Sequence, residues 1–546
     1  MWGSKNSNQQ NGEEPHDDHS SSRPISRRSY NPREPDERTA LLRQPRPPNA
    51  DGYLDPDDPA VSPYNLWSVR FLRYFTIIFL MISFIWWVIL LVSIFVSPPG
   101  MHSRGSGFFD FAYICLTIGN LLVTLIFFAE PAKALRITMA VIAVLLLVDM
   151  ILILSVARLR VEEGWVGIAS VVWAVLIAGW CIITDRAVAW GKKEEEERLT
   201  GRPETRRTLK EWLAILVATI FLVIFAIIAL LMTSTLSIRA RDATLSVEGE
   251  RILVDGDKYE VHLACMGNIS YAGDQKKPTI LLEAGEDPAE YDFEHWAYAA
   301  YKNGTISRYC YWDRPGYAWS DNAPSPHSAG MSADALSEAL AKSGEEGPWI
   351  LVSAGTGSIV SRIFSSRHLK QVIGLMIIDG YHEDLLHRIG SPGRGFILWA
   401  WGIISPLGIE RLGGALFKGR TREDRVYGRN AYQSGKFIKA QLQENLVADS
   451  LSKNEVVSAR NIQSSNTPLV IISSGIKCRT DSEWERKQND LTKLTENLVS
   501  WEVVNKAPHQ VWQTFNGREM MEKGLGDLVK AASKVKTPLD LSKLVA

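Results

Sequence analysis

The stretch Leu351–Arg362, LVSAGTGSIVSR, decides the fold of the larger part of this chain. The apolar run GPWILV leads into it and a helical pattern follows it, which predicts a sharp turn from a strand into a helix. Small residues stand at Ser353, Gly355 and Gly357, as close packing of a strand against a helix requires. Gly355 lies in the middle of the turn, where φ is expected to be positive and glycine costs least. A turn of this kind predicts an α/β domain.

Short β-type runs alternate with helical patterns from about residue 240 onward, which predicts a mainly parallel sheet. Eight strands in about 300 residues match one domain, which we place at 240–546. The predicted strands are Leu245–Val247, Tyr259–Cys265, Thr279–Glu283, Ser307–Tyr311, Trp349–Ser353, Ile373–Ile378, Leu469–Ser473 and Val499–Val504.

Six sequence blocks in this domain resemble the α/β-hydrolase superfamily, in particular a subgroup with C-x-G, EAG, YDRxGYG and HED blocks. They occur in the expected order and are His262–Gly267, Pro278–Gly285, Cys310–Asp321, the turn itself, Ile378–Asp384 and Ala507–His509. The resemblance covers roughly residues 245–535. It implies an α/β-hydrolase-like doubly wound, mostly parallel sheet with a cap inserted at about residues 385–460.

The resemblance also implies where a catalytic site would lie, and there the chain departs from the family. The family's turn reads G-x-S-x-G with the central Ser as nucleophile, and Gly355 occupies that position here. Without an oxygen or sulfur atom no acyl-enzyme can form. The neighbouring hydroxyls of Ser353, Thr356 and Ser358 are not expected to replace it.

The other site positions are carried over from the family one at a time. His509 matches the general base, and the backbone at Gly285 and Thr356 matches the oxyanion site. The expected acid is Asp481, with Asp384 or Glu383 as the alternatives, whereas Asp379 and Asp313 are expected to fix turns at strand ends. No metal site and no cofactor are expected, and the five Cys include no C-x-x-C pair.

Two functions follow from this departure. The leading interpretation is a pseudo-hydrolase that binds a ligand or partner without turnover. The alternative is an active ester or lipid hydrolase that uses an atypical nucleophile or water activated by His509. The net charge of −1 predicts no nucleic-acid partner.

Five apolar segments precede the domain, at about residues 75–96, 108–128, 137–156, 165–184 and 212–233. Each is about long enough to cross a bilayer, so residues 66–238 are predicted to be a five-helix transmembrane region. Near the spans, twelve Lys and Arg fall on the side of the N-terminus and six on the other. The positive-inside rule therefore predicts a cytosolic N-terminus and a lumenal C-terminal domain.

Residues 1–65 are rich in Ser, Pro, Asn, Asp, Glu and Arg, which predicts a disordered cytosolic tail. Within it Glu37, Leu41 and Leu42 fit the acidic dileucine pattern, which resembles a sorting signal read by adaptors for vacuolar or lysosomal membranes; a chance match is the alternative. We expect an endomembrane location, with a mitochondrial membrane as the alternative.

Several features fit an oxidising lumen. The sequons at Asn268 and Asn303 both follow the last span and are candidate glycosylation sites. Cys265 and Cys310 end two predicted strands, so a disulfide between them is a hypothesis. Besides the lipid bilayer, an apolar small molecule or a lumenal protein is a candidate partner. The apolar stretch Gly395–Phe417 is expected to lie on the membrane face, line a pocket for such a ligand, or pack on the core as a cap helix.

Overall fold

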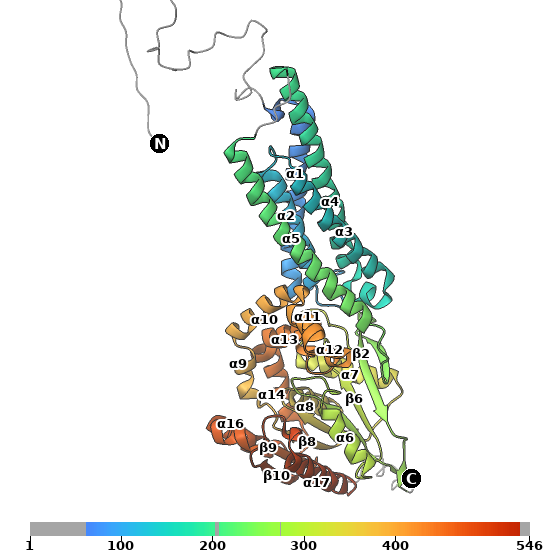
Figure 1. Ribbon diagram of the computed structural model, residues 1–546. Coiled ribbons are helices and arrows are strands. Elements are labelled where there is room, and N and C mark those ends of the chain that lie inside the picture. The colour runs from blue at the N-terminus through green and yellow to red at the C-terminus, as the bar shows by residue number, and fades with distance from the viewer. Residues whose placement is uncertain (1–61, 202–206, 273–274, 535–546) are drawn as a thin grey trace, which may run out of the picture. The chain divides into compact units, whose positions relative to one another are not determined.

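The computed structural model describes residues 62–201, 207–272 and 275–534. Among these residues, five helices are long and apolar enough to cross a membrane, and they form a bundle (Figure 1). They are α1 (Trp67–Phe95), α2 (Phe108–Ile126), α3 (Lys133–Ser155), α4 (Ala157–Thr200) and α5 (Leu209–Asp242). The prediction of a five-helix apolar region in front of the α/β domain is confirmed.

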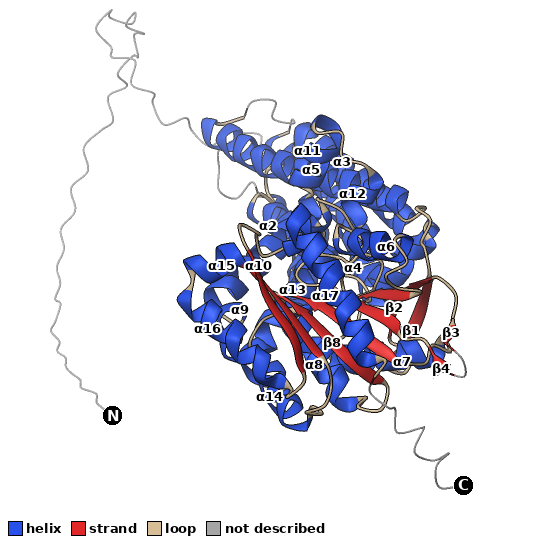
Figure 2. Ribbon diagram, turned by 90° about the horizontal axis from the view of Figure 1, so that it is seen from below, coloured by secondary structure: helices blue, strands red, loops and turns tan. Residues whose placement is uncertain are grey.

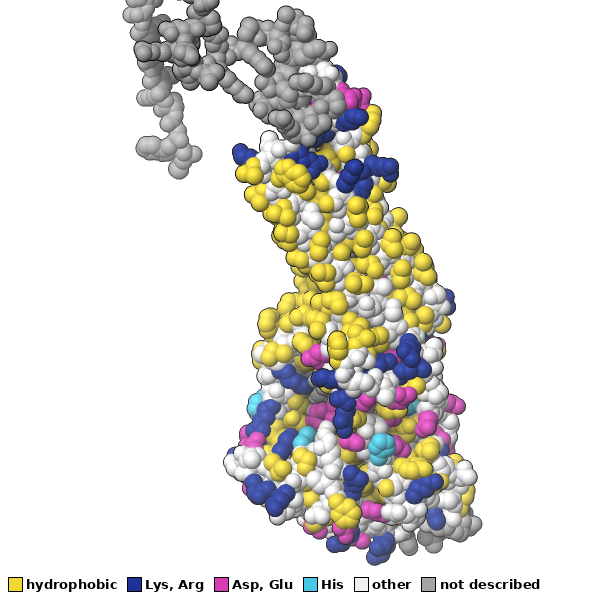
Figure 3. Space-filling model, in the orientation of Figure 1, with side chains coloured by type: hydrophobic (Ala, Val, Ile, Leu, Met, Phe, Trp, Pro, Cys, Tyr) yellow, Lys and Arg dark blue, Asp and Glu magenta, His cyan; other side chains and the backbone are white. Residues whose placement is uncertain are grey.

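The surface of the bundle is hydrophobic over most of its length, and Lys and Arg side chains gather at its upper end (Figure 3). That end carries the start of α1 and the end of α4. The predicted tail, with Glu37, Leu41 and Leu42, lies outside the described residues except for its last four positions. We call the end of the bundle that holds the start of α1 the tail side and the opposite end the domain side.

The helix α4 runs beyond its predicted span at both ends. It continues past residue 185 to Thr200, and along the way Asp185 pairs with Arg136 at 3.0 Å. At its other end Gly164 has φ 61° and ψ −166°, which breaks the helical geometry. The short segment before this break carries Arg158 and Glu162 on the domain side.

The domain is built on an eight-stranded sheet in the order β1-β2-β6-β5-β7-β8-β9-β10 (Figure 2). The strand β2 is antiparallel to both of its neighbours, and the other strands pair in parallel. The strands are β1 (Glu250–Val254), β2 (Tyr259–Met266), β5 (Thr279–Glu283), β6 (Tyr309–Asp313), β7 (Trp349–Ala354), β8 (Val372–Ile378), β9 (Leu469–Ser474) and β10 (Leu498–Val504), with a separate hairpin of β3 (Tyr271–Ala272) and β4 (Gln275–Lys276). This mostly parallel sheet with an antiparallel second strand is the α/β-hydrolase arrangement, and the predicted fold class is confirmed.

Helices cover both faces of the sheet, so the central strands are buried on both sides and read as continuous apolar runs. One face is covered by α7 (Ala329–Lys342), α8 (Gly357–Arg367) and α14 (Lys453–Ile462). The other is covered by α6 (Phe293–Lys302) and α17 (Phe515–Ala532). The helices α15 (Gly475–Thr480) and α16 (Ser482–Leu491) follow β9.

A group of helices between β8 and β9 forms the cap. Its helices before α14 are α9 (Leu386–Ile389), α10 (Pro392–Ile404), α11 (Ile409–Phe417), α12 (Arg422–Val426) and α13 (Gly435–Val447). The helix α10 packs directly on α2 of the bundle: a Cβ added at Gly402 would lie 2.1 Å from the Phe108 ring. The cap therefore rests on the apolar bundle as well as on the sheet domain.

The first strand was predicted in the wrong place. The sheet begins with Glu250–Val254, whereas Leu245 and Val247 lie in the connection that leaves α5. The Leu245 amide donates to the Asp242 carbonyl at 3.0 Å, which continues the turn at the end of the helix. Both apolar side chains line a cavity between the bundle and the domain instead of pairing in the sheet.

Candidate functional site

The turn between β7 and α8 has the sharp geometry that the sequence predicts. Gly355 has φ 45°, and its amide donates to the Ile378 carbonyl at 3.1 Å. Glycine is also required at 357, because a Cβ there would lie 2.1 Å from the Ala284 carbonyl oxygen. The turn thus packs tightly against the strand ends on both sides, and it presents a backbone position without a side chain.

The space next to Gly355 is filled by a carboxylate. A Cβ added at Gly355 would lie 2.5 Å from Oε2 of Glu286, so the Glu286 side chain occupies the place of a nucleophile side chain. The same oxygen lies 3.2 Å from Nε2 of His509. No motif in the sequence predicts a role for Glu286, although it directly follows Gly285, which matches the oxyanion site.

The other ring nitrogen of His509 is bonded to Asp379. Nδ1 of His509 lies 2.6 Å from Oδ2 of Asp379, a fully buried residue at the end of β8. The second oxygen of Asp379 accepts hydrogen bonds from the Ser474 amide at 3.0 Å and the Trp484 indole at 2.9 Å. Asp379 therefore holds the ring of His509 in one orientation, as the acid of a catalytic triad does.

The acids predicted for this role were wrong. Asp481 accepts the amides of Glu483 and Trp484 at 3.1 Å and so caps α16, while its other oxygen pairs with Arg388. Asp384 pairs with Lys487 at the protein surface. Glu383 is buried against Arg362 and Arg460. Asp379 reaches His509 because the carboxyl ends of parallel strands meet at one edge of the sheet, whereas these three carboxylates belong to the segments beyond it.

The pairing of His509 with two carboxylates fixes its charge. Burial opposes the charged imidazolium, but attraction to Glu286 and the hydrogen bond to Asp379 raise the pKa of His509 to about 9. Burial likewise opposes the Glu286 carboxylate, yet His509 lowers the pKa of Glu286 to about 2. At neutral pH the imidazole is therefore protonated and cannot accept a proton from a nucleophile.

The predicted oxyanion positions adjoin a buried cation. Arg314 donates through Nη2 to the Gly285 carbonyl and lies 3.4 Å from Oγ1 of Thr356. It also lies 3.5 Å from Glu444 and 3.8 Å from Glu283. The hydroxyl of Thr356 thus faces Arg314. A neighbouring hydroxyl is also engaged, since Ser358 donates to the Gly355 carbonyl at 2.7 Å.

Little room remains beside this site. Of the cavities among the described residues, one of about 40 Å³ lies beside Arg314 and Thr356, and one of about 10 Å³ lies beside Gly285 and Glu286. Each is on the scale of a single water molecule. A ligand pocket for a small organic molecule measures about 300–1,000 Å³. Neither of these two cavities has space for an ester substrate.

The remaining sequence-predicted positions lie away from this site. Cys265 and Cys310 face each other in the pairing of β2 with β6 and form a disulfide with an S–S distance of 2.06 Å. Asn268 is exposed. Asn303 is also exposed, and its side-chain amide donates to the Glu522 carboxylate at 3.0 Å.

One cluster offers the donor atoms that a metal ion would need. Nδ1 of His262 lies 2.8 Å from Asp313 and 3.4 Å from Glu290, and the cluster is almost fully buried. Burial and the charge of Asp313 raise the pKa of Glu290 well above its usual range. The neutral form of Glu290 is therefore favoured in this cluster.

Comparisons with known proteins give the relationship of the chain. Residues 37–265 match the family model described as "Region of unknown function (DUF2417)". An uncharacterized vacuolar membrane protein of Saccharomyces cerevisiae is 27% identical over 390 residues, which cover 61% of this chain and 60% of that protein. An uncharacterized protein of Schizosaccharomyces pombe is 32% identical over 534 residues, 90% of this chain and 96% of the relative.

Solved structures with similar domains include an α/β hydrolase from a deep-sea metagenome library, at 13% identity and a TM-score of 0.38 over 53% of this chain and 98% of that one. A thermophilic esterase from Thermogutta terrifontis is 14% identical, with a TM-score of 0.35 over 52% and 99%. The fold assignment rests on the strand order of the sheet. By its nearly full-length match, the chain belongs to the same family as the Schizosaccharomyces pombe protein.

Proposed function

We propose that this chain is a multi-pass endomembrane protein whose lumenal hydrolase-like domain binds a ligand or partner without turning it over. The observation that carries the proposal is the place of Glu286. Its carboxylate fills the nucleophile position beside Gly355 and pairs with His509. A triad histidine works by accepting a proton from the nucleophile, and here it meets a permanent anion instead.

The location is proposed from separate observations. The Saccharomyces cerevisiae relative is named a vacuolar membrane protein, which supports a vacuolar membrane for this chain. The excess of Lys and Arg on the tail side of the bundle supports a cytosolic tail. The exposed Asn268 and the disulfide between Cys265 and Cys310 support a lumenal domain.

The test introduces a serine at position 355 and then removes the carboxylate of Glu286 that fills the space beside it. The full-length protein in membranes is treated with a fluorophosphonate, which labels an activated serine. We expect no labelling of the wild-type chain and none of Gly355→Ser, because the new side chain would meet the Glu286 carboxylate at 2.5 Å. The double variant Gly355→Ser/Glu286→Ala is expected to label, since it frees both the serine and His509.

A matched control is the neighbouring carboxylate. Asp287 hydrogen-bonds to Gln510 and not to His509, so Gly355→Ser/Asp287→Ala should stay unlabelled. Adding His509→Ala to the labelled double variant should abolish its labelling. Labelling of the wild-type chain that disappears in His509→Ala would overturn the proposal.

A second candidate, an active ester or lipid hydrolase, is favoured by one observation, the 2.6 Å bond that orients His509 on Asp379. In that case Glu286 is the atypical nucleophile or the group that holds a water molecule for His509. Ester turnover by the wild-type protein that is lost in Glu286→Gln would select this candidate. Absence of turnover in both proteins selects the non-catalytic function.

A further inference from the structure

A second cavity lies where the domain side of the bundle meets the cap and the first strands of the sheet. We call it the junction cavity; its volume is about 120 Å³, that of roughly four water molecules. Two carboxylates line it, Glu162 and Asp242. The cations that line it are more numerous: Arg158, Arg239, Arg251, Arg411, Arg425 and Lys436.

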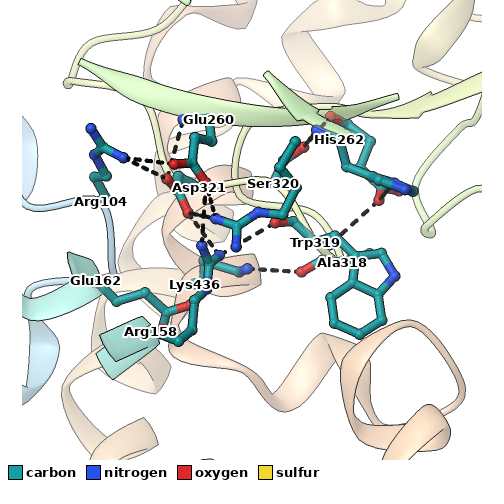
Figure 4. A network of polar contacts seen from close by, with 12 residues as sticks. Arg104, Arg158, Glu162, Glu260, His262, Ala318, Trp319, Ser320, Asp321 and Lys436 are labelled. Atoms are coloured by element: carbon teal, nitrogen blue, oxygen red, sulfur yellow. Dashed lines mark hydrogen bonds and ion pairs between the residues drawn. The ribbon is translucent and has the colours of Figure 1, made fainter. Parts of the chain in front are cut away.

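Part of this positive charge is neutralised within the wall. Arg239 pairs with Glu162 and Glu163, at 2.7 Å each. Arg158 pairs with Glu162 at 2.8 Å and with Asp321 at 2.7 Å, as the polar network at the junction shows (Figure 4). These pairs account for the cations on the bundle side of the cavity.

The cations contributed by the cap are less well neutralised. Both oxygens of Asp242 are taken by Arg425, at 2.9 and 2.5 Å, and Arg411 reaches only one of them, at 3.3 Å. Lys436 donates to the Ala318 carbonyl at 2.7 Å (Figure 4), and among the described residues it forms no ion pair. The cap therefore brings to the junction cavity a buried arginine, Arg411, that shares its carboxylate with Arg425, and a half-buried lysine, Lys436, whose hydrogen bond goes to a carbonyl.

The surroundings of Lys436 and Arg411 disfavour their charged forms. Burial lowers the pKa of Lys436 to about 8, and Arg158 adds to this effect, whereas Glu162, Asp321 and Asp313 oppose it. Burial lowers the pKa of Arg411 to about 10 against the attraction of Asp242, and Arg239 and Arg425 add to the lowering. A negative charge in the junction cavity would reverse both effects, because an opposite charge favours the protonated form.

Hydrogen-bonding groups without partners line the same space. Nε of Arg411 and Oγ1 of Thr235 are buried and have no hydrogen-bond partner among the described residues, and the exposed fractions of these residues are 7% and 2%. Nη1 of Arg158 and Nε of Arg251 are also buried atoms without a hydrogen-bond partner among the described residues. Buried donors of this kind are normally satisfied, so they indicate a missing acceptor. A phosphate group offers several acceptor oxygens and suits the fork of arginine.

An apolar cavity of about 170 Å³ adjoins the junction cavity and shares Ser405 and Arg411 with it. Trp401, Ile404 and Ile409 line its apolar part. Further apolar side chains of α10 and α11 are exposed beside it, and Figure 3 shows a hydrophobic surface that continues from the bundle onto the domain. A polar and an apolar cavity side by side at the end of a membrane-crossing bundle match the two halves of an amphiphile.

We infer that the junction cavity binds a phosphate group, held by Arg411 and Lys436, and that this group belongs to a phospholipid whose acyl chain lies against α10 and α11. The site uses none of the residues around Gly355, so it is independent of the proposed loss of catalysis. A soluble phosphate is the other source of the same chemistry, and the experiment separates the two sources.

The test measures the unfolding temperature of the full-length protein. Inorganic phosphate is titrated into the protein in detergent, and in parallel the protein is placed in phosphatidylcholine bilayers with or without phosphatidic acid. Both phosphate and phosphatidic acid are expected to raise the unfolding temperature. Arg411→Gln and Lys436→Gln should each weaken the apparent phosphate affinity by about tenfold or more, as expected for a lost charge-assisted hydrogen bond.

The matched control is Lys439→Gln, which removes a buried cation one helical turn further along α13 that does not line the junction cavity. It should respond to phosphate as the wild-type protein does. Equal responses of the Lys436 and Lys439 variants would overturn the site, as would a wild-type protein insensitive to both ligands. Stabilisation by phosphate without stabilisation by phosphatidic acid would support the phosphate site and overturn the lipid source.

A measurement on the wild-type protein tests the inference even where the variants fail to fold. The protein is purified from its native membrane in mild detergent and its bound lipids are identified by mass spectrometry. We expect a phospholipid that inorganic phosphate displaces. A preparation that carries only lipids indifferent to phosphate would overturn the inference.

Discussion

Glu286 and His509 each hold the other in its charged form, and the proposed loss of catalysis rests on this mutual effect. An active triad needs a neutral imidazole with a free lone pair on Nε2. Here Nε2 faces a carboxylate at 3.2 Å and Nδ1 faces another at 2.6 Å. The two opposite charges therefore stabilise each other in the folded domain.

The Glu286–His509 pair predicts a pH dependence of stability. The pKa of His509 is raised from 6.5 to about 9, so its contribution is full below pH 6.5 and is lost as the pH rises to 9. The pKa of Glu286 is lowered from 4.5 to about 2, so acid removes the contribution only below pH 4.5. We expect the difference in unfolding free energy between wild type and Glu286→Gln to reach at most about 3 kcal/mol between pH 4.5 and 6.5.

Thermal unfolding of both proteins between pH 5 and 9.5, in the same detergent, measures that difference. Asp287→Asn is the control, because Asp287 does not contact His509. A difference between wild type and Glu286→Gln that stays constant up to pH 9.5 would contradict the assignment of a charged pair.

The helix α10 is the element that joins the cap to the bundle. Gly402 on α10 meets the ring of Phe108, the first residue of α2, and there is no room between them for a side chain. Small residues at helix contacts let the backbones approach closely, which is how apolar helices gain packing energy in a membrane. The apolar stretch Gly395–Phe417 combines contact with the bundle and exposed apolar side chains.

Gly402→Leu is predicted to disrupt this contact. The added side chain would overlap Phe108, and overpacking typically costs about 1–3 kcal/mol. We expect a lower unfolding temperature in detergent and easier proteolysis within the cap. Gly413→Leu on α11 is the matched control, because a Cβ at Gly413 meets nothing within 4 Å. Equal destabilisation by the two substitutions would argue against a close contact between α10 and α2.

The whole molecule is predicted to carry glycan on the face of the domain that holds Asn268. Asn268 is exposed, whereas the amide of Asn303 is hydrogen-bonded to Glu522 in the folded domain. We expect endoglycosidase treatment of the full-length protein to increase its mobility. Asn268→Gln should remove most of this shift, and Asn303→Gln should remove little. No shift in any of the proteins, together with cleavage of the domain by protease added to the cytosolic side, would contradict a lumenal domain.

The sequence predicts the helices of the bundle, the strands of the sheet and the turn at Gly355 well, because the patterns that indicate them are local. The five apolar runs, the strand-to-helix turn at Gly355 and the buried strands each follow from residues close together in the chain. His509 was recognisable because it stands in a short block after the last strand. Such features need no knowledge of which distant segments meet.

The contacts that decide function could not be read in the same way. Glu286 and His509 are 223 residues apart, and Asp379 and His509 are 130 apart. The sequence alone does not separate a catalytic from a structural Asp379, because a carboxylate at a strand end fits a structural turn equally well. The junction cavity brings together the bundle, the cap and the first strands, and no periodicity in the sequence indicates that these segments meet.

Gly402 packs tightly against Phe108, and this contact opposes movement of the cap helix α10 away from the bundle. In a soluble protein a cap can lift as a lid, because only water has to enter behind it. Here, movement of α10 away from α2 would separate two packed apolar surfaces, and exposing those surfaces to water costs free energy. An apolar ligand of the kind proposed above is therefore expected to reach the cap from within the plane of the membrane and not by movement of α10 away from α2.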